Sequence, residues 1–217
     1  MRVRADVFAD RAAAGRRLAV LVEPLTGSRP VVVGMARGGV PVAYEVARAL
    51  GAPLDVVVVR KLGHPAQPEL GLGALGEDGV RIVNDALVKR LDVTPAVMDE
   101  VTRRETVELE RRCRAYRRAR LPVMLAGRTV IVVDDGLATG FTARAAVEVM
   151  RRRRAERVVL AVPVGAPRAV ASLAEFADDV VCVETVGEFS GISEWYGNFD
   201  QLSDDDAARL LAAPVTP

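Results

Sequence analysis

The sequence is poor in aromatic residues, cysteine and histidine. Aromatic side chains make up only 4% of its 217 residues, and it has two cysteines and a single histidine, His64. Cys113 and Cys182 lie in unrelated sequence contexts, so they form neither a metal-ligand motif nor a redox pair. This cysteine usage favours a reduced, cytoplasmic compartment.

The chain also has almost no net charge and no long apolar run. Its formal charge of +1 leaves no overall field to hold nucleic acid or an anionic membrane, so any anion binding must be local. Arg11, Arg16 and Arg17 interrupt the apolar residues of the N-terminal stretch 1–22. That stretch is expected to form an amphipathic helix, and neither a signal peptide nor a membrane helix.

Short β-branched runs alternate with helical patterns along the sequence. The alternation predicts an α/β fold, with a mainly parallel twisted sheet flanked by helices on both faces. Half of the residues are apolar, enough for one domain over 1–217, with a core at about 30–185 and a small cap made by the N-terminal helix and 186–217. Strands are expected at 31–33, 54–59, 130–133, 158–162 and 180–183, and helices at 41–50, 95–120, 141–154 and 167–176.

Residues 60–85 break this alternation. They contain five glycines and two prolines and show no sustained period, so we expect a long loop with a small hairpin near 70–83. Long irregular loops in compact domains are usually functional. His64 in this stretch is expected to be an exposed residue and not a catalyst. Glu69 is either a solvated loop acid or a ligand for a substrate amine or a metal ion.

The segment VIVVDDGLATGFT at 130–142 joins two adjacent carboxylates, Asp134 and Asp135, to a turn rich in glycine and threonine. The acids follow a buried strand, and the turn leads into a helix whose free N–H groups attract phosphate. Neighbouring carboxylates need hydroxyl donors or Mg²⁺ as partners. The segment therefore predicts a site for a phosphorylated pentose, and the alternative is an ordinary strand–turn–helix in which the acids cap the helix.

The sequence VVDDGLATGFTA within this segment resembles the signature of the type I phosphoribosyltransferases. The resemblance covers about 30–185 at the level of the fold, and it places the family's mobile loop in 60–85. It implies that Asp134 and Asp135 are catalytic, hold the ribose hydroxyls and bind the metal ion, directly or through water. It implies that the ribose 5′-phosphate is held by the turn, at Gly136, Ala138, Thr139, Gly140, Phe141 and Thr142.

Two further segments resemble the parts of that family that bind pyrophosphate. The first follows the first core strand, where glycines permit close approach of the backbone and Arg37 offers a planar fork for phosphate oxygens. The second is the basic end of the second strand. The resemblance implies that Lys61 is the catalytic, donor-binding residue there, with Arg60 as the second candidate for that role. The alternative is a basic strand end in solvent. The residues expected to bind pyrophosphate are Ala36, Arg37, Gly38, Gly39, Arg60 and Lys61.

Residues 103–120 include eight arginines, the one pattern that could indicate contact with nucleic acid. Acids recur four residues before arginines on this expected helix, which favours an ion-paired, solvated helix or an oligomer surface, such as that of a homodimer. The expected pairs are Glu100 with Arg104, Glu108 with Arg112, and Glu110 with Arg114.

Trp195, Tyr196 and Phe199 lie together near the C-terminus, just before Ser203 and three acids that are expected to cap a last short helix. Family members stack the nucleobase in a variable cap near this point, so Trp195 and Tyr196 are candidates for a base site. A packing role is equally consistent with their sequence.

The sequence thus predicts a phosphoribosyltransferase of nucleotide metabolism that uses 5-phosphoribosyl 1-diphosphate (PRPP) and Mg²⁺. A nitrogenous base or amine would accept the phosphoribosyl group, with release of pyrophosphate. Ala138 stands where members that act on 6-oxopurines usually have an acid, which disfavours hypoxanthine and guanine. The alternative is a non-catalytic regulatory protein that binds a phosphoribosyl ligand or a nucleotide, together with RNA.

Overall fold

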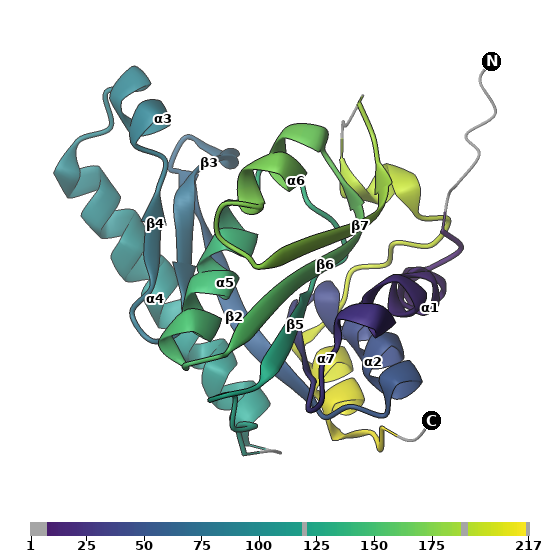
Figure 1. Cartoon of the computed structure of the whole chain (residues 1–217). Helices are drawn as coiled ribbons and strands as arrows, with labels where there is room; N and C mark the ends of the chain where they lie inside the picture. Colours follow the sequence, from purple (N-terminus) through teal and green to yellow (C-terminus); the bar gives the residue numbers. More distant parts are fainter. Residues whose placement is uncertain (1–7, 119–120, 188–190, 216–217) are drawn as a thin grey trace.

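A computed structural model describes residues 8–118, 121–187 and 191–215. Its centre is a seven-stranded sheet with the strand order β4-β3-β2-β1-β5-β6-β7 (Figure 1). The mainly parallel α/β sheet is confirmed, and each of the five expected strands is present. The parallel strands are β1 (Val31–Ala36), β2 (Leu54–His64), β5 (Thr129–Val133), β6 (Arg157–Gly165) and β7 (Asp179–Thr185).

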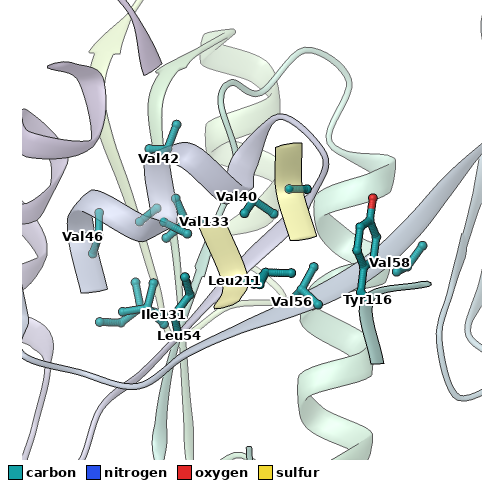
Figure 2. Close-up of a cluster of buried hydrophobic side chains, with 14 of the residues drawn as sticks. Val40, Val42, Val46, Leu54, Val56, Val58, Tyr116, Ile131, Val133 and Leu211 are labelled. Atoms are coloured by element: carbon teal, nitrogen blue, oxygen red, sulfur yellow. The ribbon is translucent and has the colours of Figure 1, made fainter. Parts of the chain in front are cut away.

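Helices cover both faces of this sheet, because successive residues of each strand point to opposite faces and both sets are apolar. Val56 and Val58 of β2 belong to one core cluster, and Val57 and Val59 belong to the other. Figure 2 shows Val56 and Leu211 within the first cluster. The helices that pack in the first cluster include α1 (Arg11–Val22), α2 (Gly39–Leu50), α4 (Pro95–Arg117) and α7 (Asp204–Ala212), and the second cluster has α5 (Phe141–Arg152) and α6 (Pro167–Leu173).

The stretch 60–85, expected as a long loop with a small hairpin near 70–83, consists mostly of paired strands, and the expected hairpin is present within it. Strand β2 continues to His64, and β3 (Gln67–Gly76) returns antiparallel to it and pairs with β4 (Arg81–Val83) (Figure 1). A Cβ on Gly73 would collide with the backbone of Ile82 in β4. The glycines that suggested a loop therefore allow close packing of strands, which a β-propensity pattern does not register. A short helix, α3 (Asp85–Arg90), then follows the cap residue Asn84.

Helix α4 begins as expected, with Thr94 as its cap and Pro95 in its first turn. Its described part ends at Arg117, and Arg120 lies outside the described residues. The ion pairs of Glu108 with Arg112 and of Glu110 with Arg114 are present. The expected pair of Glu100 with Arg104 is wrong: residues three apart also share a helix face, and Glu100 binds Arg103 while Arg104 contacts Glu105.

The N-terminal and C-terminal segments meet beside the sheet. The Phe8 N–H donates to the Trp195 carbonyl at 2.8 Å, and the Gly197 N–H donates to the Phe8 carbonyl at 2.7 Å. After the 3-10 turn η2 (Ile192–Trp195), the chain reaches α7, whose cap residue Ser203 forms a capping box with Asp206. Of the expected cap, residues 188–190 and 216–217 are not described. No helix within the described ranges is long and apolar enough to cross a membrane.

Candidate active site

A cavity of about 830 Å³ lies beyond the carboxyl ends of β1, β2 and β5. This is the edge of a parallel sheet at which ligands usually bind. Gly140 has a φ of +84° and caps α5, so the chain turns sharply from β5 into this helix. The first N–H groups of α5 have no partner within the helix, and such groups bind phosphate. The cavity lining includes Asp134, Asp135, Gly136, Leu137, Ala138, Thr139, Gly140, Phe141 and Thr142.

The two carboxylates differ in their partners. The Asp134 carboxylate accepts the N–H of Asp135 at 2.9 Å, whereas Asp135 Oδ2 accepts a hydrogen bond from Arg11 Nε at 2.9 Å. Burial raises the pKa of Asp134 well above its usual range, and the charge of Asp135 raises it further. Burial also raises the pKa of Asp135, although Arg11 partly opposes this. The pair is therefore short of positive charge, which a cation at the cavity would supply.

Arg11 lines the cavity, although its sequence context indicates only an amphipathic helix. Its guanidinium lies 3.7 Å from the centroid of the Phe199 ring, and its Nη1 donates to the Asp200 carbonyl at 3.0 Å. Its side chain is only 11% exposed. Asp135 and Asp200 are 124 and 189 residues away in the sequence, so no local pattern could have indicated these contacts.

Replacing Arg11 with Met is expected to reduce the free energy of unfolding at neutral pH by about 3 kcal/mol, because it leaves a buried carboxylate without its partner. Without Arg11 the pKa of Asp135 rises further, so the folded state binds a proton more readily than the unfolded state. The loss of stability should therefore be largest at neutral pH and shrink as the pH falls through that pKa.

Urea unfolding of the parent and of Arg11→Met, at neutral and mildly acidic pH, measures this effect. Arg16→Met on the same helix is the control, since Arg16 is 55% exposed and its nitrogen lies 3.8 Å from Glu45. A stability difference for Arg11→Met that is the same at both pH values would contradict the proposed role of the ion pair.

The loop after β1 packs directly against the two acids. A Cβ on Gly38 would overlap the Asp135 carboxylate, and a Cβ on Gly39 would overlap the Val133 carbonyl and lie 2.8 Å from Asp134 Cα. Ala36, Arg37 and Gly38 line the cavity as expected. Gly39 does not line it, and its role in the structure is to let the two backbones approach each other.

The structure separates the two expected cations at the end of β2. Lys61 lines the cavity, and its Nζ contacts the Glu69 carbonyl and lies 3.3 Å from the Glu69 carboxylate. Arg60 points the other way, and its Nε and Nη2 donate to Glu105 of α4 at 3.0 and 2.7 Å. Adjacent strand residues face opposite sides, so both could not reach one ligand from this strand. The structure does not bring Arg60 to the cavity.

The expected base-stacking residues also lie elsewhere. Tyr196 is buried, and its hydroxyl donates to the Asp135 carbonyl at 2.6 Å. Trp195 packs against a small buried cluster that includes Phe8, Val164 and Tyr196. Neither residue lines the cavity, whereas Phe199 does. His64 is half-buried near the hairpin turn, outside the cavity lining, and its Nδ1 accepts the Ala66 N–H at 3.2 Å.

Asp134 and Asp135 are also the residues that could hold a metal ion. Within the described ranges, no group of three or more His, Cys, Asp or Glu side chains could form a complete protein cage. Mg²⁺ is commonly bound through one or two carboxylates together with substrate phosphates and water. The donor set therefore fits a Mg²⁺ ion that takes its remaining ligands from outside the protein.

Known proteins match this chain closely. It is 51% identical over 205 residues to the "Putative phosphoribosyl transferase" of Mycobacterium tuberculosis, a match that covers 94% of this chain and 46% of that protein. The chain thus spans about half the length of the curated relatives it matches. A crystal structure of TT1426 from Thermus thermophilus has a TM-score of 0.79 and 40% identity, with 95% of this chain and 98% of that one covered.

A shorter match joins the chain to the "Bifunctional protein PyrR" of Chloroflexus aurantiacus, with 33% identity over 129 residues, 58% of this chain and 65% of that protein. The model of the phosphoribosyl transferase domain family matches residues 9–194, which include β1, the acidic pair and the turn into α5. The chain therefore belongs to the phosphoribosyl transferase domain family.

Proposed function

We propose that this chain transfers the phosphoribosyl group of PRPP to a nitrogenous base or amine, in the presence of Mg²⁺, and releases pyrophosphate. The observation that carries the proposal is the meeting of three parts at one cavity. These are the acidic pair, the free N–H groups at the start of α5 and the loop at Arg37 and Gly38. A volume of about 830 Å³ is within the range of small-molecule sites and has room for a donor and an acceptor.

In the proposed reaction, the lone pair of the acceptor nitrogen forms a bond to ribose C1 while the bond from C1 to the diphosphate oxygen breaks. The bonding electrons leave with pyrophosphate, and the acceptor gives up its proton. Asp134 and Asp135 hold the ribose hydroxyls and stabilise the positive charge that develops on the sugar. The start of α5 anchors the 5′-phosphate and fixes C1 near the acceptor.

The departing pyrophosphate needs cationic partners, and Arg37 and Lys61 line the same cavity as the acids. Asp134 and Asp135 would hold Mg²⁺, which would supply positive charge to the departing diphosphate. The hairpin of β2 and β3 carries Lys61 and Glu69, and the cap carries Arg11 and Phe199. These two elements border the cavity and would limit the access of water, which otherwise competes for the sugar cation.

A pyrophosphate-release screen tests this function. The purified chain is incubated with PRPP, Mg²⁺ and a panel of purine and pyrimidine bases and primary amines, and release is compared with reactions without acceptor and with a chelator. We expect release that depends on one acceptor class and is lost with the chelator. Binding of PRPP with no release for any acceptor would support the alternative, a regulatory protein that senses a phosphoribosyl ligand.

Contact with RNA would appear as binding with a steep dependence on salt. The structure offers little support for it, since acids of the same helix pair with Arg103, Arg111 and Arg114 of α4. Filter binding with single-stranded and hairpin RNA over a range of salt concentrations would test this alternative directly.

A further inference from the structure

Helix α4 contributes one residue, Arg112, to the lining of the cavity. The Arg112 side chain is 11% exposed, and its Nε donates to Glu108 at 2.8 Å. Among the residues that the structure describes, its two terminal nitrogens have no hydrogen-bond partner. A guanidinium has five N–H donors, and its terminal groups are suited to the oxygens of a phosphate.

The other basic groups near Arg112 are already held by acids. Asp204 accepts hydrogen bonds from Arg111 at 2.6 Å and from the Tyr116 hydroxyl at 2.8 Å, while Arg37 stays 3.9 Å away. Arg60 is held by Glu105. Arg37 thus has only a distant contact with Asp204 within the described part of the chain. Arg112 keeps two terminal nitrogens without a hydrogen bond there, although its charge also acts on Glu108 and Asp204.

One face of α4 binds Arg60 outside the cavity and also contributes Arg112 to the cavity lining. Glu105 and Arg112 are seven residues apart, two helical turns, so they project from one face of the helix toward β2 and its end. Glu105 binds Arg60, which the alternation of β2 already points away from the cavity. Arg112 reaches the cavity from the same face.

We propose that Arg112 is a pyrophosphate-binding residue, supplied by α4 in place of Arg60, and that it acts with Arg37 and Lys61 on the diphosphate of the donor. This inference rests on the proposed function for the identity of the ligand. It assigns to α4 a part in binding that neither its ion-paired sequence pattern nor its arginine content indicates. Helix α4 thus packs on the sheet and also lines the cavity through Arg112.

Titration calorimetry with pyrophosphate and Mg²⁺ tests the inference without any turnover. Arg112→Gln is expected to weaken pyrophosphate binding by about tenfold to a hundredfold, the usual effect of losing hydrogen bonds to a charged group. Ribose 5-phosphate lacks the diphosphate and would form no hydrogen bond with Arg112, so its affinity should change by less than about twofold. Arg112→Lys should restore part of the affinity because it keeps the charge and loses the fork.

Arg114→Gln is the matched control. Arg114 lies on the same helix, is 66% exposed and has its nitrogen 3.7 Å from Glu110, so its removal should leave pyrophosphate affinity unchanged. Arg112→Gln should fold normally, since Glu108 keeps two hydrogen bonds from Arg111 at 2.7 and 2.9 Å. Matching melting temperatures of parent and variant check this.

Three results would overturn the inference: pyrophosphate binding by Arg112→Gln as tight as in the parent, an equal loss in Arg114→Gln, or an equal loss of affinity for pyrophosphate and ribose 5-phosphate. The last would mean that the variant distorts the whole cavity. These outcomes differ from a failure of the proposed function. A parent that binds pyrophosphate but releases none from PRPP would contradict catalysis and leave the role of Arg112 standing.

Discussion

Asp135→Asn is expected to reduce phosphoribosyl transfer by about a thousandfold while the chain stays folded, an effect comparable to the loss of a main electrostatic contact to a transition state. The carboxylate lines the cavity and lies between Gly38 and Arg11. An amide of the same shape keeps one oxygen for Arg11 and loses the negative charge that would stabilise the sugar cation. The decrease should appear mainly in kcat, because the charge matters most in the transition state.

The fold should survive this change because burial already raises the pKa of Asp135 above its usual range. A raised pKa means that the folded chain holds the ionised form at a cost, so a neutral side chain of equal size is tolerated. The reverse change, loss of Arg11, leaves the charge and removes its partner, which is why that variant is expected to be the less stable of the two.

Steady-state kinetics of pyrophosphate release and a thermal melt of each variant measure the two effects. Asp99→Asn is the control, because Asp99 is 74% exposed and lies 3.9 Å from Arg81, away from the cavity lining. In the parent, activity should also fall as the pH drops through the raised pKa of Asp135. The dependence of activity on acidic pH should change in Asp135→Asn. Equal turnover by purified Asp135→Asn and parent would contradict the assignment.

The sequence indicates correctly that 134–142 lines the cavity, because one short segment contains these residues, whose roles stay predictions. The buried strand before Asp134, the two acids and the helix start at Phe141 are contiguous, so local patterns determine where each group lies. The same holds for the five parallel strands, whose apolar runs are buried on both faces. These features need no knowledge of tertiary contacts.

The parts that were missed depend on contacts between distant segments. Arg60 and Lys61 look alike in sequence, but the strand continues through both, and the alternation of its side chains sends only Lys61 to the cavity. Arg11 and Arg112 reach the cavity from helices far apart in the sequence. Each helix contains several arginines, so the sequence does not show which one lines the cavity. The hairpin of β2 and β3 was missed because glycines weaken the strand pattern.

Gly39→Ala is expected to lower transfer by about a hundredfold or more, since a displacement of roughly 1 Å in a catalytic group has this effect. The added methyl group would overlap the Val133 carbonyl and press on Asp134 Cα. Both are backbone atoms at the end of a central strand, so neither can rotate away. The overlap should also reduce the free energy of unfolding by about 1 to 3 kcal/mol, as for other overpacked sites.

Gly38→Ala should behave differently, although the two glycines are adjacent. Its methyl group would meet the carboxylate of Asp135, a side chain that can move if its bond to Arg11 breaks. We therefore expect Gly38→Ala to lose transfer activity and to retain more stability than Gly39→Ala. Denaturant unfolding and pyrophosphate-release assays on both variants separate the two effects.

Gly187→Ala is the control for these substitutions, because a Cβ at Gly187 would meet no atom within 4 Å. It should match the parent in both assays. If Gly39→Ala also matched the parent, the close approach between the loop after β1 and the end of β5 would not be needed for the site. The loop would then have to hold pyrophosphate without being fixed against the acids.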